Sequence, residues 1–101
     1  MRNNWKTYPP TKTLAVDVDG TLHDRGLVNE NVVSFCRRKK EAGFYLILWS
    51  ARGAEYATQA AKDHGVEDIF DVIISKPGFI LDDQGWSWIK FTEVIRDISE
   101  A

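Results

Sequence analysis

Four carboxylates and one hydroxyl occupy positions from which they could do chemistry together. Asp17 and Asp19 end an apolar segment near the start of the chain, Asp82 and Asp83 end a second one, and Ser50 ends a third. Short apolar segments of this kind are typical of strands, and a parallel sheet binds its ligands at the carboxyl ends of its strands. We therefore expect these five side chains at one edge of a single sheet.

A divalent cation would relieve the repulsion among these acids. Two close carboxylates repel each other by roughly 4 kcal/mol at an effective dielectric constant near 20. Oxygen ligands and water suit Mg²⁺, and the sequence contains no His/Cys cluster typical of zinc. The acids therefore favour a Mg²⁺ site, and the alternative interpretation is that each pair only caps a turn.

The elements that would position these side chains alternate between strands and helices. Strands are expected at 13–18, 44–49, 71–75 and 79–81, and helices at 30–42, 54–64 and 86–98. The six apolar residues of 44–49 indicate a strand that is buried on both faces. Asn29 is a typical N-cap, and Gly43 and Gly65 are typical helix ends. This alternation predicts an α/β fold with a mainly parallel sheet flanked by helices.

Length and composition limit the organisation of the chain. Its 101 residues suit one small domain, expected over 12–101 after a polar lead-in over 1–11. The longest apolar run is far shorter than the roughly 20 residues that span a bilayer, and the first residues do not resemble a signal peptide. A single cysteine fits a reducing compartment, so we expect a cytoplasmic protein. The formal charge of −2 argues against nucleic-acid binding through charge alone.

Three strings carry a resemblance to a known family. LAVDVDGTLHD resembles the first motif of the haloacid dehalogenase-like (HAD) hydrolase superfamily, an apolar strand followed by D-x-D-x-T. LILWSAR resembles the second motif and FILDD the fourth, so the resemblance covers roughly residues 12–95. It implies a Rossmann-like core similar to that of small bacterial and phage members of the superfamily.

The resemblance also implies a role for each matching residue. Asp17 would be the nucleophile, Asp19 the general acid/base, and Ser50 a hydrogen-bond donor to the phosphoryl group, while Thr21 would steady the loop at the substrate. The implied Mg²⁺ ligands are Asp17, Asp19 through its backbone carbonyl, Asp82, and Asp83 directly or through water. An acid/base carboxylate distinguishes phosphatases of the superfamily from its dehalogenases, so the implied reaction is phosphate-ester hydrolysis through an aspartyl-phosphate.

The chemistry of carboxylates agrees with these roles. An aspartate is ionised at neutral pH, so it can act as a nucleophile without a base. The general acid must instead hold a proton. Neighbouring carboxylates would raise the pKa of Asp19 in the direction that this role requires.

The cation of the superfamily is matched by Lys76, but its position is ambiguous. Only three residues separate the segments 71–75 and 79–81, whereas parallel neighbours need a crossover of a dozen or more. Either one segment is a short edge piece, or both form an antiparallel turn of type II through Pro77-Gly78. The turn would place Lys76 far from the expected edge, which leaves a turn lysine as the alternative and Arg52 as a substitute cation that binds substrate.

Short connections leave no room for the cap domain that many superfamily members carry. An open site suits a bulky phosphorylated substrate, such as a nucleic-acid end or a phosphoprotein, or a small one enclosed by a second copy in a homo-oligomer. Two alternatives stay open beside a general phosphatase. One is a nucleotide or nucleic-acid-end phosphatase of the same chemistry, and the other is a non-catalytic binding module of HAD fold.

Overall fold

The computed structural model describes residues 9–98, which fall into two units. One unit is 12–78, and the other comprises the residues before and after it. Most of the expected lead-in over 1–11 lies outside the described residues. A single domain over 12–101 stays a prediction, and the two units are described separately below.

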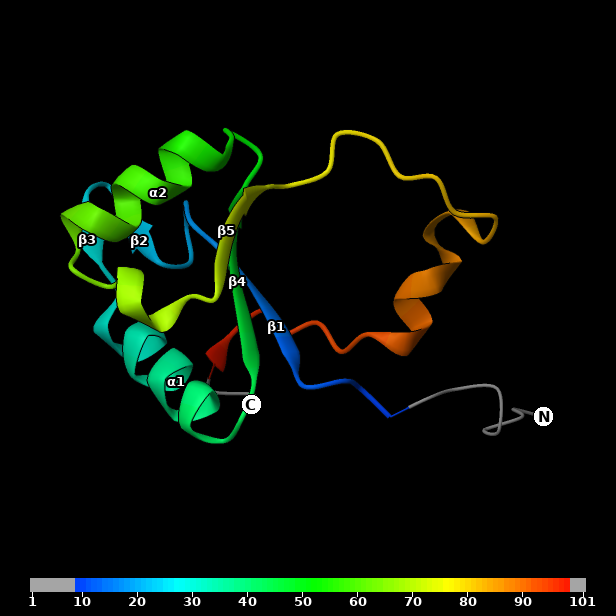
Figure 1. Ribbon diagram of the computed structural model, residues 1–101, viewed down its shortest axis with the longest axis horizontal. Helices are drawn as coiled ribbons and strands as arrows, with labels where there is room; N and C mark the ends of the chain where they lie inside the picture. Colours follow the sequence, from blue (N-terminus) through cyan, green and yellow to red (C-terminus); the bar gives the residue numbers. More distant parts are fainter. Residues whose placement is uncertain (1–8, 99–101) are drawn as a thin grey trace. The chain divides into compact units, whose positions relative to one another are not determined.

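A three-stranded parallel sheet organises the unit 12–78. Its strands are β1 (Thr13–Asp17), β4 (Tyr45–Ser50) and β5 (Val72–Ser75), in the order β1-β4-β5 (Figure 1). Asp17 pairs with Trp49 and Ser50 pairs with Ser75, so the three strands end at one edge. The α/β class and the parallel sheet are confirmed, and the arrangement is compatible with a Rossmann-like core.

Two helices connect the strands and lie on one side of the sheet. Helix α1 (Glu30–Glu41) joins the hairpin after β1 to β4, and α2 (Ala54–Asp63) is followed by the short 3₁₀ helix η2 (Glu67–Ile69) before β5. Both crossovers step in the same direction across the sheet, so crossovers of one hand place both helices on one face, as Figure 1 shows. The fully buried core side chains include Leu22, Leu46, Leu48, Cys36, Ala57 and Ile69.

The expectation that β4 is buried on both faces is wrong. Leu46 and Leu48 are completely buried, but Tyr45 is 49% exposed and Ile47 and Trp49 are half-buried. The cause is the one-sided helix layer, because alternate side chains of a strand point to opposite faces. An unbroken apolar run therefore does not by itself require two covered faces.

The predicted ends of α1 are confirmed. The Asn29 side chain accepts hydrogen bonds from the backbone N–H groups of Asn31 and Val32, at 3.1 and 3.3 Å. Gly43, just beyond the helix, has φ +91°, which a residue with a side chain rarely adopts. Both ends therefore follow from local sequence.

The connection after β1 contains a small hairpin that the sequence analysis did not predict. Its strands are β2 (His23–Asp24) and β3 (Leu27–Val28), which pair antiparallel. Arg25 and Gly26 form the two-residue turn, with φ values of +52° and +79°. Positive φ at both positions is the signature of a type I′ turn, which suits tightly paired strands.

The residues 79–98 differ from the prediction. No strand occurs at 79–81 within the described part of the chain, and Phe79 is 97% exposed. The expected helix over 86–98 is replaced by a 3₁₀ helix, η3 (Gly85–Phe91). Most helical stability comes from a packed apolar face, and Trp86, Ile89 and Ile95 of this segment are exposed. Among the described helices, none has the length and apolar character needed to cross a membrane.

Candidate active site

An ion pair links the ends of the two outer strands. Lys76 directly follows β5, and its Nζ lies 3.1 Å from Oδ1 of Asp17, the last residue of β1. The backbone N–H of Lys76 also donates to the carbonyl of Ser50, at 2.9 Å. Both side chains of the pair are about one-third exposed, 38% and 35%, so the pair is accessible from solvent.

The position of Lys76 was ambiguous because a strand was expected at 79–81, and this strand does not form in the described chain. Strand β5 runs parallel to β4. Lys76, which directly follows β5, therefore emerges at the carboxyl edge of the sheet. The alternative of a type II turn through Pro77-Gly78 is wrong, since such a turn needs positive φ at its second central residue and Gly78 does not have it.

Asp19 sits on a tight turn immediately after β1. The carbonyl of buried Val18 accepts backbone hydrogen bonds from Thr21, Leu22 and His23, and the N–H of Gly20 donates to the His23 carbonyl. Gly20 has φ +81°, which permits the sharp change of direction. The turn leaves the Asp19 side chain 47% exposed beside the end of the sheet.

Three hydrogen-bond donors surround the Asp19 carboxylate. The Tyr56 hydroxyl donates to its Oδ1 at 2.5 Å, and Nε2 of His23 lies 3.1 Å from the same oxygen. Nη1 of Arg52 lies 3.4 Å from Oδ2. The Arg52 guanidinium also lies over the Tyr56 ring, 3.8 Å from its centroid. Tyr56 and Arg52 therefore support each other as well as Asp19.

These donors overturn the expected direction of the Asp19 pKa. The hydrogen bond from Tyr56 is the main cause of a lowered pKa at Asp19, and those from His23 and Arg52 act the same way against an opposing desolvation. The same bond raises the pKa of Tyr56. Sequence reasoning placed carboxylates beside Asp19, whereas in the unit 12–78 its neighbours are groups that stabilise the ionised form.

A second histidine extends this cluster. Nδ1 of His23 lies 2.7 Å from Nε2 of His64, and the two rings meet edge to face with centroids 5.0 Å apart. His64 follows α2, which also carries Tyr56. Sequence reasoning missed the roles of Tyr56 and His64. Arg52 precedes α2 and Tyr56 lies within it, so no local sequence pattern indicated these contacts.

Ser50, Thr21 and Arg52 occupy the same edge of the sheet. Ser50 is buried, and its Oγ accepts a hydrogen bond from the Arg52 backbone N–H at 3.0 Å. Thr21 lies on the turn after Asp19. Ser75 holds the adjacent helix, since its Oγ accepts from the N–H of Ala54 at 2.9 Å. The contacts of Ser50 and Thr21 with a phosphoryl group stay predictions.

Asp82 and Asp83 belong to the unit 79–98. The Asp82 carboxylate accepts a hydrogen bond from the backbone N–H of Gln84 at 2.8 Å, and the Asp83 carboxylate accepts from the Gln84 side chain at 3.4 Å. These are local contacts of a turn. The roles of Asp82 and Asp83 as metal ligands stay predictions.

Within the unit 12–78, Asp17 is the carboxylate of the sheet edge that could take part in a magnesium site. No group of three or more His, Cys, Asp or Glu side chains suited to a metal occurs in the described residues. Mg²⁺, however, commonly uses only one or two carboxylates, with water and substrate phosphate completing its coordination. Asp17 uses Oδ1 for Lys76, and its second carboxylate oxygen can serve as a ligand.

Comparison of the chain with protein-family models, with curated protein sequences and with solved structures gives no match. The geometry of these side chains and the motifs in the sequence are therefore the observations from which a function can be inferred.

Proposed function

We propose that this protein is a Mg²⁺-dependent phosphatase of HAD type that hydrolyses phosphate esters through an aspartyl-phosphate on Asp17. The observation that carries the proposal is the contact between Nζ of Lys76 and Oδ1 of Asp17, 3.1 Å at the carboxyl edge of a parallel sheet. A nucleophilic carboxylate repels a phosphate dianion, and a lysine at this position offsets that repulsion.

In the first step, a carboxylate oxygen of Asp17 attacks phosphorus and the bond from phosphorus to the ester oxygen breaks. The ester oxygen leaves as an alcohol after it takes a proton from the carboxylic acid form of Asp19. The negative charge of bound phosphate raises the pKa of Asp19 and so favours this form against the donors around it. Lys76 and Arg52 compensate charge on the phosphoryl oxygens.

In the second step, water attacks the phosphorus of the aspartyl-phosphate. Asp19, now ionised, takes a proton from that water, the bond between phosphorus and Asp17 breaks, and inorganic phosphate leaves. The donors Tyr56, His23 and Arg52 lower the pKa of Asp19 and so favour this basic form. The net reaction converts a phosphate ester and water into an alcohol and phosphate.

We propose that Asp17 and the backbone carbonyl of Asp19 would hold magnesium, and that Asp82 and Asp83 would be its other protein ligands. When bound, it supplies charge neutralisation for the phosphate and for the attacking carboxylate. The proposal also includes a cytoplasmic location and, for small substrates, a homo-oligomer that encloses the open site.

The test is hydrolysis of p-nitrophenyl phosphate and acetyl phosphate by the purified protein, with Mg²⁺ and with EDTA. We expect turnover that requires Mg²⁺, and intact-protein mass spectrometry after rapid acid quenching should detect one added phosphoryl group. Asp17→Asn should remove both signals, because an amide is a poor nucleophile.

Asp63→Asn is the matched control, since it makes the same chemical change at an exposed residue at the end of α2. It should behave as the wild type. Equal turnover in the wild type and in Asp17→Asn would contradict the mechanism. A wild type with Mg²⁺ that turns over neither these compounds nor a panel of nucleotides, phosphorylated oligonucleotides and sugar phosphates would instead support the non-catalytic binding module.

A further inference from the structure

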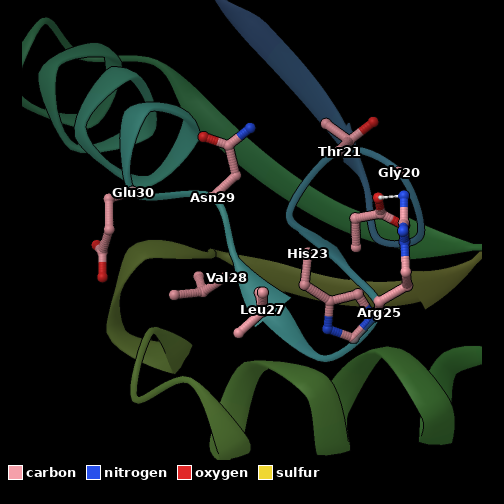
Figure 2. A pocket seen from close by; sticks show the side chains of 9 residues that line it. Gly20, Thr21, His23, Arg25, Leu27, Val28, Asn29 and Glu30 are labelled. Carbon is pink, nitrogen blue, oxygen red and sulfur yellow. Dashed lines mark ion pairs between the residues drawn. The ribbon is translucent and has the colours of Figure 1, made fainter.

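A pocket opens next to Gly20, the residue that follows Asp19. Its volume is about 500 Å³, and it is lined by the turn after β1, the β2–β3 hairpin and the first residue of α1 (Figure 2). Sites for small molecules usually have volumes of roughly 300–1,000 Å³. Gly20, which follows Asp19, and His23, which contacts the Asp19 carboxylate at 3.1 Å, both lie on its wall.

The position of the pocket suits the leaving alcohol of the proposed reaction. Asp19 protonates the ester oxygen, so the alcohol part of the substrate must lie next to Asp19 when the bond breaks. The wall of the pocket includes Gly20 and His23, two direct neighbours of Asp19, so the pocket offers space for this alcohol. A pocket built from the hairpin replaces the enclosure that a cap domain would otherwise provide.

The charges of the pocket disfavour a polyanion. Asp24 and Arg25 form an ion pair at 3.4 Å on the hairpin, and Figure 2 marks this pair. Glu30 also lines the pocket and takes part in none of the ion pairs found within residues 9–98. The pocket lining thus contains one arginine and two carboxylates, which gives it a net negative charge. A nucleic-acid end would bring several phosphates toward this surface, where they meet net negative charge.

The remaining lining favours hydroxyl groups over a nucleobase. Thr21 offers a hydroxyl, and Asn29 offers its amide N–H₂ because its Oδ1 already caps α1. Leu27 and Val28 add a small apolar surface. Among the described residues that line the pocket, none is Trp, Tyr or Phe, the side chains on which bases usually stack. A hydroxyl group can both donate and accept a hydrogen bond, so a neutral alcohol rich in hydroxyl groups can pair with Thr21 and Asn29, while its C–H groups contact Leu27 and Val28.

We infer that this pocket receives the alcohol part of the phosphate ester and selects a neutral polyhydroxylated alcohol, so that the substrate is a sugar phosphate or polyol phosphate. The inference rests on the proposed phosphatase function. It favours this class over nucleotides and phosphorylated nucleic-acid ends, which become outcomes of the test.

Binding is measured first, with Asp17→Asn so that no turnover occurs. Glucose 6-phosphate, glucitol 6-phosphate, AMP and inorganic phosphate are titrated separately, in the presence of Mg²⁺, into the ¹⁵N-labelled variant. We expect the two polyhydroxylated esters to bind at least about tenfold more tightly than AMP or phosphate. They should shift the backbone amide signals of residues 20–30. Equal or tighter binding of AMP would overturn the inference.

A second variant fills the pocket. Leu27 is 77% exposed, so Leu27→Trp places a large side chain in the pocket without disturbing the core. Added to Asp17→Asn, it should abolish the preference for the polyhydroxylated esters. In the otherwise wild-type enzyme, the ratio of kcat/KM for glucose 6-phosphate to kcat/KM for acetyl phosphate should fall by about tenfold or more. Acetyl phosphate reports the chemistry with a small leaving group.

Ala42→Trp, at the exposed far end of α1, is the control and should leave both substrates unaffected. Failure of the inference and failure of the proposed function give different results. If Leu27→Trp keeps the wild-type ratio while Asp17-dependent turnover persists, the pocket assignment alone is overturned. If the wild type hydrolyses no ester, the phosphatase proposal is contradicted, and so is the assignment of the pocket to the leaving alcohol.

Discussion

Lys76 and Asp17 meet across the central strand of the sheet. Asp17 ends β1 and Lys76 follows β5, the two outer strands, yet Nζ lies 3.1 Å from Oδ1. Neighbouring strands are about 4.8 Å apart, so the lysine side chain must reach over the end of β4. The backbone hydrogen bond from Lys76 to Ser50, the last residue of β4, fixes the starting point of that reach.

Removal of the Lys76 charge tests this relationship. Lys76→Met keeps a long apolar side chain, but it leaves Asp17 without its cation when a phosphate dianion approaches. We expect turnover of a phosphate ester to fall by about 10²–10³. Lys62→Met, at an exposed residue of α2, should keep wild-type activity. Turnover of Lys76→Met within about twofold of the wild type would show that Arg52 or another cation carries the role.

Tyr56 sets the protonation of Asp19. Because the Tyr56 hydrogen bond is the main cause of the lowered pKa of Asp19, Tyr56→Phe should raise that pKa toward its ordinary value. Carboxyl ¹³C NMR measures the change directly. The second step needs ionised Asp19, so as the pH is lowered the activity of Tyr56→Phe should begin to fall at a higher pH than that of the wild type. Tyr45→Phe is the control, since Tyr45 is an exposed residue at the start of β4.

The same shift has a consequence for stability. The folded pKa of Asp19 is depressed, so its contribution is present above the unfolded pKa and is lost as the pH falls through the folded pKa. Tyr56→Phe should shrink this contribution, which reduces the difference in unfolding free energy between neutral and acidic pH. Identical Asp19 titration curves in the wild type and in Tyr56→Phe would contradict the assignment.

Local sequence signals predicted the elements of the unit 12–78 well. The apolar segments gave the three parallel strands, and Asn29, Gly43 and Gly65 marked helix ends that the structure confirms. These features succeed because caps and left-handed glycines act within a few residues. The hairpin over 23–28 escaped prediction because its strands have only two residues each.

The neighbours of Asp19 could not be read from the chain in the same way. Tyr56 and His64 reach Asp19 and His23 only through the packing of α2 beside the turn, which is a tertiary relationship. The segment 79–81 illustrates the opposite error, since an apolar run predicts a strand only where a partner strand exists. Three residues after β5 are too few for a parallel crossover, and this limit was already visible in the sequence.

Burial of Cys36 predicts a further pH effect. Cys36 lies on α1, 1% exposed, and burial raises the pKa of its thiol to about 11 from the ordinary 9.0. A folded pKa above the unfolded one stabilises the fold below about pH 9, and this contribution is lost as the pH rises toward about 11. Urea unfolding across this range should show the decline.

Cys36→Ala should be less stable at neutral pH, because it leaves a small cavity, but its stability should decline less between about pH 9 and 11. The wild-type thiol should also react with a disulfide reagent only after unfolding. Rapid modification of the folded protein at about pH 8 would contradict the burial of Cys36.

The N-cap of α1 gives the last prediction. The Asn29 side chain accepts hydrogen bonds from the N–H groups of Asn31 and Val32, and an alanine side chain cannot accept them. Asn29→Ala should therefore lower the free energy of unfolding by about 1 kcal/mol. Asn31→Ala is the control, since Asn31 is exposed on the same first turn and alanine favours a helix. Urea unfolding of both variants checks the difference. Equal stability of the two would mean that the cap contributes nothing.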